Sequence, residues 1–271
     1  MESVSVEGDT MVTVVHHHGP SPGADRPPLV LLHGFPLDSQ MWAEVIAELP
    51  QIPVLAVDLP GFGAAREAAE PDGATLESFA DAVVGALRDA GISRAVVAGL
   101  SMGGYVLMAL AQRHADLLAG VGLLDTKAGE DTVEARTGRL SVANRALGPD
   151  GAQAVAGMIE GLLGPTSRAE RSEVVEQVRH WLAQAPPEGI AGAQRAMATR
   201  PDRLAVLQTL QVPALVLYGS EDALAGAEAH EAMARALGTE PVVVQGAGHL
   251  SAVEEPAAVA EALAQLYQRS I

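Results

Sequence analysis

Short, wholly apolar runs recur along the chain and alternate with helical patterns. The clearest runs span residues 29–32, 54–57, 95–98 and 214–217, and two similar runs span 121–124 and 241–244. Runs without polar alternation are typical of strands buried on both faces, as in a parallel sheet. Strands that alternate with helices build such a sheet with helices on both faces. The chain is therefore predicted to be an α/β protein with a mostly parallel, eight-stranded sheet, counting a hairpin near the N-terminus.

The remaining patterned segments fit this architecture. Residues 3–6 and 11–16 alternate in hydrophobicity around Gly8-Asp9, which predicts the hairpin. Thr75 stands just ahead of one helical pattern and is interpreted as its N-cap. The helical patterns span residues 39–49, 76–90, 102–114, 227–237 and 256–267.

One region breaks the alternation. From about Lys127 to Leu207 the chain carries helical patterns and no strand pattern. Apolar stripes at helical spacing include Val155, Met158, Ile159 and Leu162, and then Val174, Val178 and Trp181. We predict a helical insertion over residues 127–207 after the sixth strand, within a core formed by residues 1–126 and 208–271.

Length, charge and composition narrow the class of protein. The 271 residues, 48% of them hydrophobic, suit one globular domain with an insertion. A formal net charge of −17 repels nucleic-acid phosphates and anionic lipid, so neither is an expected partner. The absence of cysteine excludes disulfides and a thiol nucleophile. No signal-peptide pattern or transmembrane-length apolar run is found, so a cytoplasmic protein is expected, as a monomer or weak homodimer.

A serine motif stands at the end of one predicted strand. Residues 99–103 read Gly-Leu-Ser-Met-Gly, which matches G-x-S-x-G directly between the run 95–98 and a helical pattern. That setting is the one a nucleophile elbow requires, because the turn is sharp and side chains at 99 and 103 would clash with neighbouring elements. The motif predicts Ser101 as a nucleophile, and the alternative is an ordinary N-cap serine.

A serine hydroxyl needs a base at neutral pH. His249 lies in the glycine-rich segment 246–250 just after the last predicted strand, at the carboxyl end of the sheet where ligands bind. The run of His16, His17 and His18 is interpreted as solvated, and no metal site is predicted. His33 is expected to shape its loop, and His114, His180 and His230 read as surface or packing residues. His249 is therefore the predicted base.

The imidazole in turn needs a carboxylate to orient it. Asp222 follows the run 214–217 and completes the chain order Ser, Asp, His. Glu221 is adjacent but is expected to point elsewhere along the turn. Asp125 ends the preceding strand and remains an alternative acid. Asp222 is favoured by its position after its strand.

Acyl transfer also needs donors for a negative oxygen. One is the backbone N–H of the residue after the nucleophile, Met102. The other is expected from the loop after the run 29–32, where Phe35 is the candidate because Pro36 has no N–H.

Several short sequence motifs, taken in their order along the chain, resemble those of the α/β-hydrolase superfamily over essentially the whole chain. The motifs span residues 33–36, 58–63, 99–104, 219–222 and 248–249. More closely, residues 124–128 and 185–190 resemble small bacterial carboxylesterases and the related 3-oxoadipate enol-lactonases. The resemblance implies a helical cap over the site, hydrolysis of short-acyl esters and no cofactor. By position, it assigns the oxyanion donors to Phe35 and Met102 and the triad to Ser101, Asp222 and His249.

The chain departs from the resemblance at two places. Ala65 stands where many relatives have serine, and residues 223–226 lack a proline that often follows the acid loop. The cap would supply the substrate pocket, with Met158, Leu162, Trp181 and Met197 as candidates. For each of these residues the alternative is packing of the cap onto the sheet.

The leading hypothesis is a cofactor-free carboxylesterase acting on small esters through an acyl-enzyme. Ser101 argues against epoxide hydrolases and haloalkane dehalogenases of this fold, which use an aspartate nucleophile. Enol-lactonase is the alternative within serine chemistry, and thioesters, C–C bonds and peroxide chemistry stay open. A non-catalytic small-molecule receptor is the alternative of another class.

Overall fold

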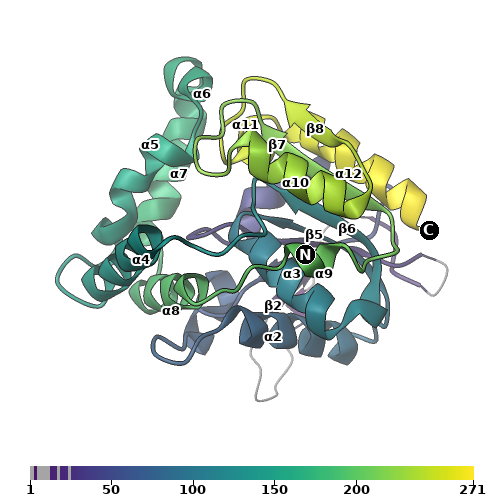
Figure 1. Cartoon of the computed structure of the whole chain (residues 1–271), viewed down its shortest axis with the longest axis horizontal. Helices are drawn as coiled ribbons and strands as arrows, with labels where there is room; N and C mark the ends of the chain where they lie inside the picture. The colour runs from purple at the N-terminus through teal and green to yellow at the C-terminus, as the bar shows by residue number, and fades with distance from the viewer. Residues whose placement is uncertain (1–2, 5–12, 17–18, 24–25) are drawn as a thin grey trace.

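A single sheet forms the centre of the computed structural model, which describes residues 3–4, 13–16, 19–23 and 26–271 (Figure 1). In the described chain the sheet has eight strands in the order β1-β2-β4-β3-β5-β6-β7-β8. Six of these, β3 to β8, pair in parallel, and β1 and β2 pair antiparallel at one edge. The strands are β1 (Ser3–Val4), β2 (Thr13–His16), β3 (Leu29–Leu32), β4 (Val54–Asp58), β5 (Ala95–Leu100), β6 (Leu118–Leu124), β7 (Ala214–Gly219) and β8 (Pro241–Val244). The predicted parallel sheet flanked by helices is confirmed.

The N-terminal hairpin is confirmed in its pairing. Ser3 pairs with Val15 and Val4 with Val14, in antiparallel register. The predicted turn at Gly8-Asp9, together with His17 and His18, lies outside the described residues.

The central strands are more deeply buried than β8, the strand at one edge of the sheet. Every residue of β3, β4, β5 and β6 is buried, as the apolar runs predict. β8 differs, because Val242 and Val243 are 40% and 38% exposed. The expectation that this run is buried on both faces is therefore wrong: β8 is an edge strand with one neighbour, β7.

Helices cover both faces of the sheet. α3 packs on β5, and α2, α9 and α10 lie on the same side, while α12 packs on β6 with α1 and α11 beside it (Figure 1). The elements are η1 (Ser39–Trp42), α1 (Ala43–Ala47), η2 (Gly63–Ala68), α2 (Leu76–Asp89), α3 (Met102–Arg113), η3 (Ala115–Leu117), α9 (Leu204–Leu207), α10 (Ala227–Leu237), α11 (Ser251–Glu254) and α12 (Pro256–Ser270). The single helix predicted over 39–49 is instead a 3₁₀ turn followed by a short α-helix.

Thr75 caps α2 as predicted. Its hydroxyl accepts a hydrogen bond from Ser78 N at 3.0 Å, and Ser78 Oγ accepts one from Thr75 N at 3.0 Å. This reciprocal pair satisfies two N–H groups that the first turn of a helix otherwise leaves without partners.

A helical segment follows β6 in the chain and ends before β7. In Figure 1 its helices α4 to α8 lie to one side of the sheet. They are α4 (Val133–Ala146), η4 (Gly151–Met158), α5 (Ile159–Leu162), α6 (Pro165–Glu170), α7 (Ser172–Gln184) and α8 (Pro187–Ala198). Among the described residues, no helix combines the length and apolar character needed to cross a bilayer.

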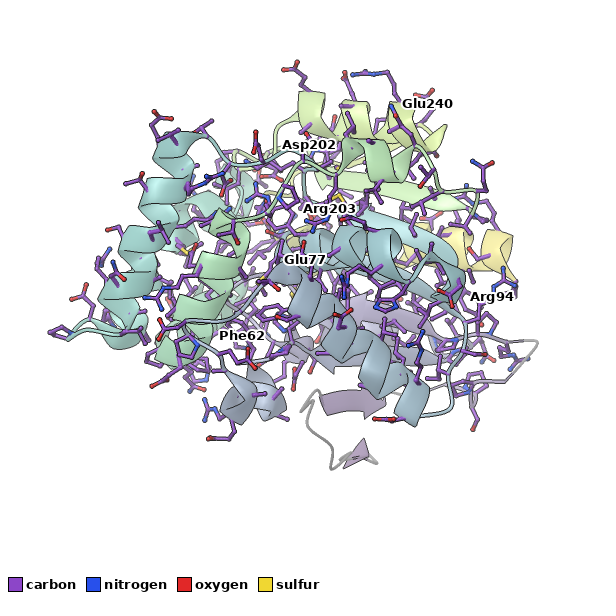
Figure 2. All side chains as sticks on the ribbon, turned by 60° about the horizontal axis from the view of Figure 1, so that its bottom comes forward. Phe62, Glu77, Arg94, Asp202, Arg203 and Glu240 are labelled. Carbon is purple, nitrogen blue, oxygen red and sulfur yellow. The ribbon has the colours of Figure 1, made fainter. Side chains whose placement is uncertain are left out.

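Arg203, whose side chain is buried, connects both ends of this segment to the core. Its backbone N–H donates to Ala128 O at 3.0 Å, and its Nε donates to Gln112 Oε1 at 3.1 Å. Its guanidinium also pairs with Glu77, beside which it lies in Figure 2. Glu77 belongs to α2 and Gln112 to α3. Both ends of the helical segment therefore lie next to these two helices.

Candidate active site

Ser101 occupies a sharp turn between β5 and α3. Its backbone angles, φ 53° and ψ −110°, are unusual for a residue with a side chain. Glycine is required on both sides, because an added Cβ at Gly99 would lie 2.3 Å from the carbonyl of Gly103. A Cβ at Gly103 would lie 2.2 Å from Leu32 O. The predicted clash of side chains at both positions is therefore confirmed, and the turn presents Ser101 at the N-terminus of α3.

His249 lies in the loop between β8 and α11 and is 5% exposed. Its Nε2 is 2.8 Å from Ser101 Oγ. This distance is within the range in which a histidine takes a proton from a hydroxyl. The fold thus brings together two residues that are far apart in the sequence.

Asp222 follows β7 and completes a hydrogen-bonded chain. His249 Nδ1 lies 3.0 Å from Asp222 Oδ1 and 2.9 Å from Oδ2. Oδ1 also accepts the N–H groups of Leu224 at 2.8 Å and Ala225 at 3.1 Å. Burial opposes the charge of Asp222, but the hydrogen bond and charge of His249 and these two N–H groups outweigh it and lower its pKa. An ionised Asp222 favours the tautomer in which Nε2 faces Ser101 without a proton.

The two alternative acids have other partners. Asp125 Oδ1 accepts the N–H of Gly219 at 2.9 Å, and its Oδ2 contacts the hydroxyl of Ser251. Glu221 accepts from the N–H and hydroxyl of Thr166 and points away from the imidazole, as expected. Among the described residues, only Asp222 contacts the ring of His249 through a carboxylate.

The loop after β3 lies beside Ser101. A Cβ added at Gly34 would be 3.6 Å from Ser101 Cβ. His33 anchors this loop as expected: its Nδ1 is 3.0 Å from Gly34 O, and its Nε2 accepts the N–H of Leu59 at 2.9 Å. The Phe35–Pro36 peptide is cis. Within the described residues the N–H groups of Phe35 and Met102 donate to no protein group, so both are free to bind an oxyanion.

Glu254 is a residue of the site that sequence reasoning missed. Its buried Oε1 accepts the N–H of Gly248 at 2.9 Å and that of Leu250 at 3.2 Å, on either side of His249. Its Oε2 accepts the N–H of Gly164, from the helical segment, at 2.9 Å. One carboxylate therefore holds the histidine loop and joins it to that segment. The available signal was the acidic pair Glu254-Glu255 soon after His249.

The four pocket candidates have different surroundings. Leu162 is buried, and its carbonyl accepts the N–H of Leu250 at 3.1 Å, next to His249. Met197 is buried with its sulfur 3.4 Å from Arg139 Nη1. Met158 packs against the core. Trp181 lines a groove of about 270 Å³ with Pro36 and Phe62, between the helical segment and the loops after β3 and β4.

Metal ligands are not assembled in the described part of the chain. No group of three or more histidine, aspartate or glutamate side chains there is placed to hold a metal ion.

Comparison with known proteins identifies the family. Residues 29–262 match the model of the alpha/beta hydrolase family. A thermophilic esterase from Thermogutta terrifontis, solved with malate bound, is 36% identical with a TM-score of 0.90 over 99% of this chain and 98% of that one. The enol-lactonase from Burkholderia xenovorans LB400 is 28% identical with a TM-score of 0.84 over 98% and 100% of the two chains.

A curated relative extends beyond this chain. The bifunctional biotin biosynthesis protein of Cellvibrio japonicus is 30% identical over 90% of this chain, which spans 48% of that protein's length. The family match covers most of the sequence and includes every residue of the hydrogen-bonded chain described above. The protein therefore belongs to the alpha/beta hydrolase family and is a hydrolase enzyme.

Proposed function

We propose that this hydrolase cleaves small, short-acyl carboxylic esters, with Ser101 as nucleophile, His249 as base and Asp222 as the orienting acid. The observation that carries the proposal is the continuous hydrogen-bonded chain from Ser101 Oγ through both ring nitrogens of His249 to Asp222. The likeness to the Thermogutta esterase over nearly its full length supports an ester as the substrate.

The first half of the reaction forms an acyl-enzyme. Ser101 Oγ attacks the ester carbonyl carbon while His249 Nε2 takes the hydroxyl proton. The carbonyl oxygen becomes negative and accepts the N–H groups of Phe35 and Met102. The carbon–oxygen bond to the alcohol then breaks, and His249 gives its proton to the departing alkoxide.

The second half restores the enzyme. His249 removes a proton from water, whose oxygen attacks the acyl carbon, and the same two N–H groups bind the oxygen again. The bond to Ser101 Oγ breaks, the serine regains its proton from His249, and the carboxylic acid leaves. Throughout, the charge of Asp222 stabilises the imidazolium, which is consistent with the lowered pKa of that carboxyl.

Residues 127–207 are proposed to form a cap subdomain on a core of residues 1–126 and 208–271. Three contacts between this segment and the histidine and acid loops support a position over the site: Leu162 O with Leu250 N, Gly164 N with Glu254, and Thr166 with Glu221. Met158, Leu162, Trp181 and Met197 would then contribute to the walls of the substrate pocket.

Hydrolysis of p-nitrophenyl esters from acetate to decanoate tests the proposal. The wild type is expected to turn over the short esters best, and Ser101→Ala to lower kcat by about 10⁴-fold or more. Ser251→Ala, another buried serine beside the site, is the matched control and retains most of the activity. Turnover that survives Ser101→Ala would exclude Ser101 as the nucleophile.

Similarity to an enol-lactonase supports a second candidate, hydrolysis of a lactone by the same residues. An unsaturated lactone and its open-chain ester, compared at equal concentration, separate the two functions. A kcat/KM at least ten times higher for the lactone would favour the second candidate.

A further inference from the structure

Alternate residues of one short stretch contact the two parts of the chain that carry the acid and the base. Residues 162–166 run from the last residue of α5 to the second residue of α6, in the part of the helical segment that lies beside α11 (Figure 1). Leu162, Gly164 and Thr166 each make a hydrogen bond outside the helical segment. We call residues 162–166 the bridging segment.

The bridging segment contacts the chain on both sides of His249. Gly164 and Gly248 are buried and packed backbone to backbone. A Cβ added at Gly164 would lie 2.9 Å from Gly248 N, and a Cβ added at Gly248 would lie 2.2 Å from Gly164 N, so neither position has room for a side chain. On the other side of the base, Leu162 O accepts the N–H of Leu250 at 3.1 Å.

The bridging segment also contacts the residue before the acid. Glu221, which directly precedes Asp222, accepts the N–H of Thr166 at 2.9 Å through Oε2 and its hydroxyl at 2.5 Å through Oε1. These two hydrogen bonds lower the pKa of Glu221, and hydrogen bonds to an ionised carboxylate are stronger than those to a neutral acceptor. The N–H of Glu221 donates to Ala247 O at 2.8 Å, which joins the acid loop to the histidine loop directly.

The geometry of the triad depends on where these two loops lie. His249 Nε2 is 2.8 Å from Ser101 Oγ, and His249 Nδ1 is 2.9 Å from Asp222 Oδ2. Within the described residues, the bridging segment forms hydrogen bonds to neighbours of the acid and the base and to neither of their side chains. A displacement of about 1 Å in such an arrangement can cost about 100-fold in rate.

We propose that Gly164 and Thr166 are positioning residues for the base. They fix the chain beside His249 and Asp222, so that the imidazole stays within hydrogen-bond distance of Ser101. The inference rests on the proposed function and adds a dependence of kcat on the helical segment.

Gly164→Ala tests the steric contact without removing any hydrogen-bonding group. The backbone angles of Gly164, φ −63° and ψ 153°, suit alanine, so the added Cβ acts only by pushing Gly248 away. The kcat for p-nitrophenyl acetate is expected to fall by about 10- to 100-fold. Gly138→Ala, in α4 of the same helical segment, is the matched control, because a Cβ there meets no atom within 4 Å. It is expected to leave kcat unchanged.

Thr166→Val tests the contact with the acid loop by removing one hydroxyl. It is expected to lower kcat by about tenfold and to leave KM within about twofold, because the loop loses one of its two hydrogen bonds to the bridging segment. Thr166→Ser retains the hydroxyl and is expected to restore most of kcat. Thr137→Val is the matched control, because the Thr137 hydroxyl donates to Val133 O within its own helix, at 2.8 Å.

Two further measurements separate positioning of the base from a change in the substrate pocket. A displaced base slows both halves of the reaction, so kcat is expected to fall by the same factor for acetate, butyrate and octanoate esters. Diethyl p-nitrophenyl phosphate phosphorylates an activated serine and releases one p-nitrophenolate per enzyme. The rate of that release is expected to fall in parallel with kcat, because the same base activates Ser101. Thermal melting checks that every variant is folded.

The outcomes separate this inference from the proposed function. Unchanged kcat and phosphorylation rates in Thr166→Val and a folded Gly164→Ala would overturn the positioning role and leave the esterase intact, and Thr166→Val decides if Gly164→Ala does not fold. A loss confined to KM or to long esters, or shared by Thr137→Val, would also overturn it. If the folded wild type hydrolyses no ester, the proposed function fails and the phosphorylation rates decide the inference. A wild type that is not phosphorylated either would overturn both.

Discussion

Two aspartates follow neighbouring parallel strands of this sheet, and they differ in their hydrogen-bond partners and in the direction of their pKa shifts. Asp125 comes directly after β6, and Asp222 comes three residues after the end of β7. Asp222 contacts His249 through both carboxylate oxygens. Asp125, with φ of 46°, instead points to Gly219 N and Ser251.

Their pKa values shift in opposite directions. Burial, and next the charge of Asp222, raise the pKa of Asp125 well above its ordinary value, against the hydrogen bonds from Ser251 and Gly219. The pKa of Asp222 is lowered because His249 and two N–H groups outweigh burial. Burial alone therefore does not decide whether a carboxyl is charged, because the partners decide it. Asp125 is suited to hold the loops together, and Asp222 to stabilise an imidazolium.

The largest expected effect is loss of kcat on replacing the acid. Asp222→Asn should lower kcat by about 10³- to 10⁴-fold, because an amide no longer favours the tautomer that leaves Nε2 free to take a proton. Asp125→Asn is the matched control and should retain kcat within about tenfold. Ester hydrolysis by both purified variants measures this difference. A larger loss in Asp125→Asn than in Asp222→Asn would reverse the assignment of the acid.

A third buried carboxylate sharpens the comparison, because Glu254 contacts only backbone N–H groups. Glu254→Gln should cost about 2 kcal/mol of unfolding free energy, since the amide nitrogen cannot accept one of the three N–H groups. It should lower kcat by about tenfold through a displaced histidine loop. Glu255→Gln, which alters the neighbouring residue paired with Arg171, is the control for urea unfolding and kinetics. Equal effects of the two changes would argue against a positioning role for Glu254.

The two aspartates should contribute to stability in opposite pH ranges. The contribution of Asp125, whose folded pKa is raised, is complete below the unfolded pKa and is lost as pH rises through the folded pKa. That of Asp222, whose folded pKa is lowered, is present above the unfolded pKa and is lost as pH falls through the folded pKa.

Urea unfolding from acid to alkaline pH tests this contrast. Asn at position 125 imitates the protonated acid, so the unfolding free energy of Asp125→Asn should increase relative to that of the wild type as pH rises. Asp222→Asn should instead lose its disadvantage as pH falls. Parallel curves for the wild type and Asp125→Asn would show that Asp125 is ionised in the folded protein.

The smallest expected effect is on unfolding free energy and concerns the N-cap of α2. Thr75→Ala removes the capping pair of α2 and should cost about 1 kcal/mol or less of unfolding free energy. Neither kcat nor the pH dependence of stability should change, because the cap is an uncharged surface contact far along the chain from either aspartate. A change in kcat would mean that general loss of stability, and not the local chemistry, lowers activity in the other variants.

Much of this arrangement could be predicted from local patterns. The apolar runs predicted the buried strands β3 to β6, and the helical pattern over 227–237 matches α10. β8 was misjudged because three apolar residues look alike at the centre and at the edge of a sheet, while their exposure depends on the number of neighbouring strands. The helix expected over 39–49 was misjudged because its first turn is tightened, with Asp38 capping a 3₁₀ turn.

The parallel α/β architecture and the sharp turn at Ser101 follow from local sequence patterns, because periodicity and the steric demand for glycine act within a few residues. The folded structure was needed to show that Asp222, rather than Asp125, contacts His249, because both residues follow adjacent strands and only the directions of their loops distinguish them. It also revealed that Glu254 bonds the histidine loop and that Asp131 pairs with both Arg139 and Arg200. These groups lie far apart along the chain, and their free energy of interaction depends on distances and burial that exist only after folding.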